Sequence, residues 1–358
     1  MKIWNWRRWL GRRRTLAVLV SLAAGLAVAA AVPASAATTL PPSTVLEADV
    51  PFAVGLSPGA DLINEPASQV ASQIGAMAAA GDKYIRIDVN WSVVEPSPGV
   101  YHWGAEDTAL DDAVGAGLTV DALMAYAPSW ALTSGTPDPV AFAQFAQKVV
   151  QRYAPVGVNI YEVWNEPNLG YSWNNQVSPM SYGNFLKEAY LSIHAVAPQA
   201  VVLMGGLGLG PALDNNLAWA PYDFLSKLYA YGFGSYFDAV NLHPYSYPDA
   251  PLTNDPVNNP VFPNLPQYYQ LMVANGDALK KIWITEYGYP TANDPKAVTE
   301  QQQYNYLLQA IVALMSQPYA GPMFLFSWQD DPYQSFGLLR QDGSAKPALS
   351  LFEIAPHF

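Results

Sequence analysis

Short apolar runs alternate with longer amphipathic stretches along most of this 358-residue chain. The runs have the length and composition of buried strands, and the stretches between them have the length and periodicity of helices. The predicted strands are 52–56, 84–91, 118–126, 159–164, 200–205, 239–242, 281–285 and 322–327. The predicted helices are 66–80, 107–116, 140–153, 181–196, 222–231, 267–275, 298–315 and 346–354.

Eight β-then-α units over about 300 residues predict an α/β protein built as a single (β/α)₈ TIM barrel. The competing architecture, an open doubly wound sheet, carries a Gly-rich phosphate loop after its first strand. Residues 56–60, after the first predicted strand, form no such pattern. The glycine-rich run Gly205–Gly210 follows the fifth strand and leads into Pro211. We therefore interpret it as a flexible loop at the rim and not as a nucleotide site.

The N-terminal segment has the pattern of an export signal. Residues 1–14 carry basic residues and no acid, an apolar run follows over 16–32, and Ala34-Ser35-Ala36 supplies a cleavage pattern. The run is nearly long enough to span a membrane, but its Ala-rich composition and its ending favour removal. We expect a cleaved signal peptide over 1–36, a linker over 37–50 and a catalytic domain over 51–358. The protein is then secreted by a bacterial Sec or twin-arginine route and keeps no stable membrane anchor.

Composition and charge limit the possible partners. The chain has 51% hydrophobic residues, which suffices for one large core, and no cysteine, which excludes disulfides and thiolate metal sites. It has 29 acidic and 17 basic residues, and cleavage of the signal peptide removes only basic ones. Such a surface disfavours nucleic acid and, mildly, anionic substrates. Asp330 and Asp331 have no partnering cluster, so we expect no metal site there. We also expect no cofactor and a monomeric protein.

Two glutamates stand at the carboxyl ends of buried strands. The fourth predicted strand ends in Asn165-Glu166-Pro167, and the seventh ends at Glu286. The carboxyl ends of the strands form the working face of a barrel, so this pair suits a two-carboxylate site. Other polar or aromatic residues at strand ends join the candidate site: Arg86, Asp88, Asn90, His243, Tyr245, Trp328, Gln329 and Asp330.

These motifs resemble those of glycoside hydrolase clan A, the retaining (β/α)₈ glycosidases, with family 39 or a family 5-like enzyme nearest. Trp164-Asn165-Glu166-Pro167 is similar to the fourth-strand signature of the clan, and Ile284-Thr285-Glu286-Tyr287-Gly288 to its seventh-strand signature. Similar segments elsewhere are 95–103 after the second strand, His243-Pro244-Tyr245 after the sixth and Phe326-Ser327-Trp328 on the eighth.

The resemblance, together with the chemistry of acetal cleavage, gives roles to seven of these residues. Glu166 is the expected acid/base and Glu286 the expected nucleophile, while Asn165 binds the sugar 2-hydroxyl. Arg86 would keep Glu286 ionised and Tyr245 would donate a hydrogen bond to it. His243 is expected to bind a sugar hydroxyl and Trp328 to stack on a sugar ring. Further aromatic residues in rim segments are candidates for a glycan cleft: Tyr126, Trp130, Tyr171, Trp173, Trp219, Tyr287 and Tyr333.

The leading hypothesis is an exported retaining glycoside hydrolase that acts on a neutral β-linked oligosaccharide or polysaccharide. A carbohydrate-binding pseudoenzyme would keep the aromatic residues and lose a carboxylate, and both carboxylates are present. A cell-wall structural protein is disfavoured by the lack of repeats. An arabinofuranosidase or iduronidase-like activity uses the same machinery and stays open.

Overall fold

The computed structural model describes residues 50–59, 62–173, 176–210, 217–254 and 261–354. They all belong to one compact unit, Ser43–Phe358. The expected signal peptide and nearly all of the expected linker lie outside the described residues. Within the described ranges, no helix is both long enough and apolar enough to cross a membrane.

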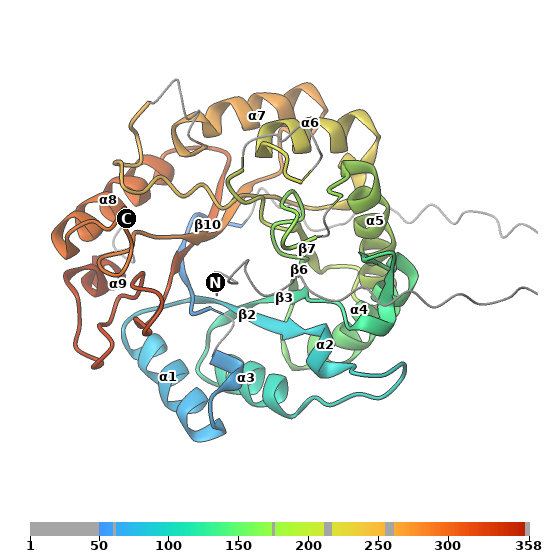
Figure 1. The fold of residues 1–358 in the computed structure, drawn as a ribbon, viewed down its shortest axis with the longest axis horizontal. Helices are drawn as coiled ribbons and strands as arrows, with labels where there is room; N and C mark the ends of the chain where they lie inside the picture. Colours follow the sequence, from blue (N-terminus) through green and yellow to red (C-terminus); the bar gives the residue numbers. More distant parts are fainter. Residues whose placement is uncertain (1–49, 60–61, 174–175, 211–216, 255–260, 355–358) are drawn as a thin grey trace, which may run out of the picture. The chain divides into compact units, whose positions relative to one another are not determined.

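Eight parallel strands form the central sheet, in the order β7-β6-β3-β2-β1-β10-β9-β8. The strands are β1 (Val54–Ser57), β2 (Tyr84–Asn90), β3 (Thr119–Ala125), β6 (Ile160–Val163), β7 (Val201–Met204), β8 (Val240–Asn241), β9 (Ile282–Tyr287) and β10 (Ala320–Phe326). Bridges between Leu203 and Ala239 and between Leu207 and Leu242 join the two edge strands. The sheet thus closes into a barrel, and the helices surround it (Figure 1). The predicted (β/α)₈ barrel is confirmed.

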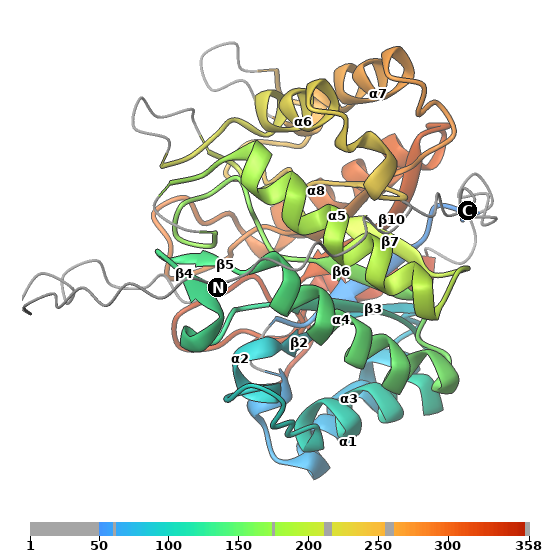
Figure 2. The same cartoon turned by 90° about the vertical axis from the view of Figure 1, so that its right-hand side faces the viewer.

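The helices follow the strands in the predicted order. They are α1 (Ala67–Ala79), α2 (Trp91–Val94), α3 (Gly104–Gly115), α4 (Pro139–Tyr153), α5 (Pro179–Val196), α6 (Pro221–Ala230), α7 (Leu265–Ala274), α8 (Glu300–Met315) and α9 (Leu351–Ile354). The last predicted helix is in fact the 3₁₀ turn η8 (Pro347–Ser350) followed by the single turn of α9. The sequence prediction missed α2 and the hairpin of β4 (Leu132–Thr133) and β5 (Thr136–Pro137), which lies at one end of the barrel (Figure 2).

Capping residues set the helix starts that the apolar pattern places imprecisely. Helix α5 begins two residues earlier than predicted, because the Ser178 side chain accepts a hydrogen bond from the Ser181 amide and Pro179 occupies the first position. Helix α8 begins two residues later, because Thr299 and Gln302 form a reciprocal capping box. In both places local hydrogen bonding, and not hydrophobic periodicity, decides where the helix begins.

The apolar core is divided into two clusters by the barrel wall. The larger cluster fills the space between strands and helices. The smaller one consists of the inward-facing residues Ile160, Val201, Leu203, Ala239, Trp283 and Phe324. Side chains two positions further along a strand point to the same side, so the next inward layer on β6 and β9 is polar: Glu162 and Thr285. An apolar layer at the amino ends of the strands therefore supports a polar layer near their carboxyl ends.

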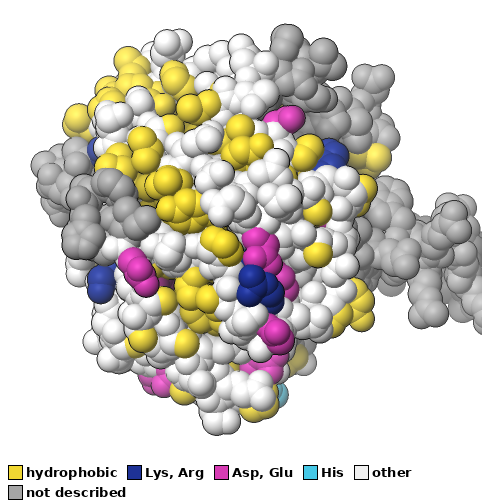
Figure 3. Space-filling view, turned by 90° about the vertical axis from the view of Figure 1, so that its left-hand side faces the viewer, with side chains coloured by type: hydrophobic (Ala, Val, Ile, Leu, Met, Phe, Trp, Pro, Cys, Tyr) yellow, Lys and Arg dark blue, Asp and Glu magenta, His cyan; other side chains and the backbone are white. Residues whose placement is uncertain are grey.

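Charged side chains are sparse on the outside. The face shown in Figure 3 is mostly uncharged, with scattered acidic and basic side chains and small groups of hydrophobic ones. One acid on the outer wall is enclosed: Asp82, between α1 and β2, is 1% exposed, and its Oδ2 has no hydrogen-bond partner. Burial raises the pKa of Asp82 to about 8. The hydrogen bond from the backbone amide of Tyr84 lowers this pKa, but by less than burial raises it.

The buried Asp82 makes stability fall as the pH rises. The unfolded chain releases this proton near its ordinary pKa of 3.8, whereas the folded protein keeps it to about pH 8. Unfolding therefore releases a proton between these values, and the free energy of unfolding decreases through that window. We predict that Asp82→Asn raises the melting temperature by a few degrees at pH 8 and changes it little at pH 4.

Thermal denaturation across pH 4 to 9 measures the effect, with Asp111→Asn, at an exposed position of α3, as the matched control. Glu106, which is fully buried with a pKa raised by burial to about 7, keeps part of the slope in the variant. Equal melting temperatures for the wild type and Asp82→Asn at pH 8 would contradict the assignment.

Candidate active site

The end of β6 turns sharply so that three consecutive polar or aromatic side chains point in different directions. Trp164 has φ 73° and Glu166 has φ 46°, both in the left-handed region that non-glycine residues rarely adopt. Packing holds this turn. Trp164 is 3% exposed, its ring lies against Phe142 and Phe185, and its Nε1 donates to a backbone carbonyl. The turn carries Glu166 out of the strand direction and over the mouth of the barrel.

Arg86 is the central cation of the site. Its Nε donates to Glu162 Oε2 at 2.7 Å and its Nη2 to Glu162 Oε1 at 3.0 Å. Its Nη1 donates to Glu286 Oε1 at 2.6 Å, and Nη2 also reaches Asn165 Oδ1 at 2.8 Å. Arg86 is 3% exposed and Glu162 is fully buried. One guanidinium from β2 therefore ties together β6 and β9, and it holds two of the predicted site residues.

Glu286 is held as an anion. Besides Arg86, the Tyr245 hydroxyl donates to its Oε2 at 3.0 Å, and His243 Nδ1 lies 3.7 Å from the same oxygen. Burial raises the pKa of Glu286, but the positive charges of His243 and Arg86 outweigh burial and lower the pKa below its ordinary value. This carboxylate is ionised at neutral pH.

His243 lies between the two carboxylates. Its Nδ1 is 3.3 Å from Glu166 Oε1 and 3.7 Å from Glu286 Oε2. Its Nε2 is 2.9 Å from Thr285 Oγ1, so both ring nitrogens face protein groups. Burial lowers the pKa of His243, yet the charge of Glu286 and the bond to Glu166 together raise it above its ordinary value. One imidazole nitrogen thus lies within 3.7 Å of both carboxylates.

Glu166 is enclosed by the barrel on one side and covered by a single tyrosine on the other. It is 2% exposed, and its Oε1 faces His243. Its other oxygen, Oε2, accepts a hydrogen bond from the Tyr171 hydroxyl. Tyr171 is itself 61% exposed, so it covers the carboxylate from the solvent side. The sequence prediction placed Tyr171 among the rim aromatics without a specific partner.

The glycine run 205–210 forms the wall behind Glu166 and His243. A Cβ atom on Gly206 would lie 2.1 Å from His243 Nε2, and one on Gly208 would lie 2.3 Å from Glu166 Oε1. The first four residues of the run are buried, and Gly208 exchanges two hydrogen bonds with the Asn168 side chain. The expectation of a flexible rim loop is therefore wrong. Glycine is needed here for close approach to the site and not for mobility.

Two more acids share the polar layer with Arg86. Asp121 is fully buried, and neither of its oxygens has a hydrogen-bond donor nearby. Burial raises the pKa of Asp121 well above its ordinary value, and the adjacent charge of Glu162 raises it further. Both effects favour the protonated form of Asp121. Burial likewise raises the pKa of Asp88 to about 6, against the opposing effects of Arg86 and Tyr126.

Of the seven residues to which a role was assigned, the structure brings six into one hydrogen-bonded group: Arg86, Asn165, Glu166, His243, Tyr245 and Glu286. The seventh, Trp328, is 5% exposed and belongs to the core cluster, so its stacking on sugar stays a prediction. The same holds for contact of His243 with a sugar hydroxyl. Four residues of the polar group were not predicted: Asp121, Glu162, Asn241 and Thr285.

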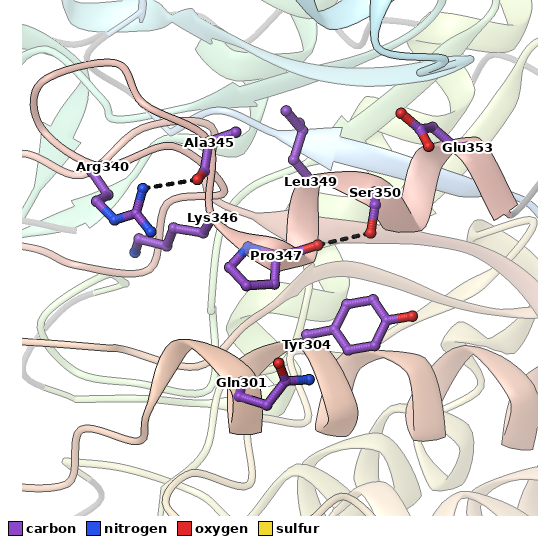
Figure 4. A pocket seen from close by; sticks show the side chains of 9 residues that line it. All are labelled: Gln301, Tyr304, Arg340, Ala345, Lys346, Pro347, Leu349, Ser350 and Glu353. Carbon is purple, nitrogen blue, oxygen red and sulfur yellow. Dashed lines mark hydrogen bonds between the residues drawn. The ribbon is translucent and has the colours of Figure 1, made fainter.

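A hollow lies on the outer wall, away from the group around Arg86. It has a volume of about 540 Å³ and lies between α8 and the C-terminal segment, as Figure 4 shows. Its two cations are already paired: Arg340 bonds Glu300 and Lys346 bonds Asp330. None of its lining residues belongs to the group around Arg86. Within the described ranges, no cluster of three or more acidic or histidine side chains is arranged to hold a metal ion.

Comparison with known proteins shows that this barrel is a clan A glycosidase. Residues 62–331 match the model of the cellulase family, glycosyl hydrolase family 5. The chain belongs to this family.

Individual relatives are more distant. An endoglucanase of Clostridium saccharobutylicum is 30% identical over 90 residues, which is 24% of this chain and 19% of that protein. A family 39 glycoside hydrolase from Bacteroides cellulosilyticus has a TM-score of 0.67 at 23% identity, over 86% of this chain and 64% of that one. A β-xylosidase from Caulobacter crescentus has a TM-score of 0.65 at 19% identity, over 86% and 71%. The chain thus spans about a fifth of the endoglucanase and under two thirds of the first structure.

The wall of glycines yields a direct test. We predict that Gly208→Ala lowers glycosidase activity at least about tenfold while the protein stays folded, because the added methyl group must displace the Glu166 carboxyl group or Leu169. Gly75→Ala is the matched control. Position 75 lies within α1, where an added methyl group meets no atom within 4 Å, and alanine favours the helix. Hydrolysis rates and melting temperatures measure both variants. Wild-type activity in folded Gly208→Ala would show that this wall does not position Glu166.

Proposed function

We propose that this glycosidase cleaves a neutral β-linked glycan by double displacement with retention of configuration. Glu286 is the nucleophile and Glu166 the acid/base. The observation that carries the proposal is the unequal environment of the two carboxylates around His243. Glu286 is bonded to Arg86 and Tyr245, which favours its ionised form, whereas no cation other than the shared His243 contacts Glu166 within the described residues. A retaining enzyme needs this asymmetry.

The reaction follows from these positions. In the first step Glu286 attacks the anomeric carbon, the glycosidic bond breaks, and Glu166 gives its proton to the leaving oxygen. In the second step Glu166 takes a proton from water, the water oxygen bonds to the anomeric carbon, and Glu286 leaves as a carboxylate. Arg86 donates a hydrogen bond to Asn165 Oδ1, so the side-chain nitrogen Nδ2 of Asn165 is left to donate to a sugar hydroxyl.

His243 suits both halves of this cycle. In the free enzyme the negative charge is on Glu286, and after the first step it is on Glu166. The same nitrogen of His243 lies 3.3 Å from one carboxylate and 3.7 Å from the other. It therefore stabilises the charge before and after the transfer without moving.

A neutral glycan fits the acidic composition of the chain and the family to which it belongs. The neighbouring structures include an exo-β-1,4-mannosidase and a β-xylosidase, which supports a β-linked substrate. We further propose that the protein is exported and that residues 1–36 are removed. A carbohydrate-binding pseudoenzyme and an arabinofuranosidase or iduronidase-like activity are the alternatives. A screen of aryl β-glycosides and polysaccharides distinguishes them.

Loss of the acid/base should be selective. We predict that Glu166→Ala keeps the first step for substrates with good leaving groups, because the nucleophile survives and only the proton donor is lost. Azide should restore turnover and yield a β-glycosyl azide. Equal loss for every leaving group, with no effect of azide, would argue against the assignment of Glu166.

Loss of the nucleophile should be general. We predict that Glu286→Gln lowers kcat by several orders of magnitude for all substrates while glycan binding persists, because the amide keeps its shape but cannot form the glycosyl ester. Mass spectrometry with a 2-fluoro-glycoside should show a covalent adduct on Glu286 of the wild type and none on the variant. An adduct on another residue would refute the assignment.

A further inference from the structure

The two oxygens of Glu166 differ in what can reach them. Oε1 is closed by protein on two sides. His243, which is fully buried, lies 3.3 Å away, and Gly208 lies so close that even a methyl group there would collide with this oxygen. Neither neighbour can leave without disturbing the barrel wall. A substrate oxygen therefore has to approach Glu166 at Oε2.

Oε2 is occupied by the hydroxyl of Tyr171. Tyr171 is 61% exposed, whereas Glu166 is 2% exposed, so the ring stands at the surface with its hydroxyl turned inward. A general acid has to be within about 2.6–3.2 Å of the atom that receives its proton. The Tyr171 hydroxyl and the glycosidic oxygen therefore require the same position.

We propose that Tyr171 occupies the proton-transfer position of Glu166 in the free enzyme, and that the leaving-group sugar displaces the Tyr171 hydroxyl when the substrate binds. This proposal rests on the proposed function, in which Glu166 is the acid/base. Tyr171 is then a positioning residue that acts through Glu166. Its ring is largely exposed and belongs to neither apolar cluster, so the displacement moves no residue of the core.

Tyr171 also biases the charge of Glu166 before the substrate arrives. Burial and the charge of Glu166 raise the pKa of Tyr171, so the hydroxyl keeps its proton and acts as a donor. A hydrogen bond donated to a carboxylate favours its ionised form, which is the wrong form for the first step. Displacement of the hydroxyl by the substrate removes this bias at the moment when a protonated Glu166 is needed.

Other ionisable groups near Glu166 and Tyr171 come from four further parts of the barrel. They are Arg86 on β2, Tyr126 after β3, His243, Tyr245 and Tyr247 after β8, and Glu286 on β9. Replacement of Tyr171 by phenylalanine leaves all of them in place and keeps the ring. Any change in the pH profile of that variant therefore reports the lost hydroxyl.

The test compares two pH profiles of Tyr171→Phe. The alkaline limb of kcat/KM reports the acid of the free enzyme, and that of kcat reports the acid of the enzyme–substrate complex. We expect the kcat/KM limb to move up by about 0.5–1 pH unit, because the free enzyme loses the donor, while the kcat limb stays in place. The acid limb, set by Glu286, should not move. The substrate is whichever of cellotetraose, xylotetraose and mannotetraose the wild type hydrolyses fastest.

Two controls separate the possible failures. Tyr231→Phe, at the exposed C-terminal end of α6, should leave both limbs unchanged. Glu166→Gln should abolish the alkaline limb of the residual activity. If that limb persists in Glu166→Gln, the proposed function fails. The other failure is that the alkaline limb is lost in Glu166→Gln, but Tyr171→Phe moves the alkaline limbs of both kcat/KM and kcat, or moves neither. In that case the acid/base assignment holds and the displacement of Tyr171 is refuted.

Discussion

The structure of the site depends on one buried cation. Arg86 is 3% exposed and makes four hydrogen bonds to Glu162, Glu286 and Asn165. A guanidinium at this depth is tolerated only because carboxylates surround it, and each carboxylate is tolerated only because of the guanidinium. The partners come from strands that are far apart in the sequence, and barrel closure brings them together. The charged layer therefore requires the closed barrel, and its members hold one another in position at the catalytic face.

The fold could be predicted because strands buried on both sides leave continuous apolar runs. All eight predicted strands were found, with boundaries no more than two residues away. The errors concern elements too short to show a period. Helix α2 is a single turn set by the Asn90 cap, and β4 and β5 have two residues each. The eighth helix was predicted as one element, but 347–350 is a 3₁₀ turn that begins at a proline.

The site was predicted only where polar residues end a strand. Glu162 and Asp121 lie inside apolar strands, and the sequence does not say which side of a strand faces inward. A signal was available: Arg86, Asp121 and Glu162 are isolated charges in buried runs, and such charges have to meet one another. Gly205–Gly210 was misinterpreted because glycine serves both mobility and close approach, and only the neighbouring side chains distinguish the two. Tyr171 could not be linked to Glu166 because loop conformation decides that contact.

The raised pKa of Asp121 has a consequence for protein engineering. The polar layer holds Asp121, Glu162 and Glu286 beside a single arginine, and a proton on Asp121 helps to balance the charge. In a variant intended for alkaline detergents or pulping liquors, loss of this proton in the barrel interior therefore limits tolerance of high pH, whatever residues the surface carries. Asparagine at position 121 has nearly the same shape and no proton to lose. It is the replacement with which adaptation to such conditions should begin.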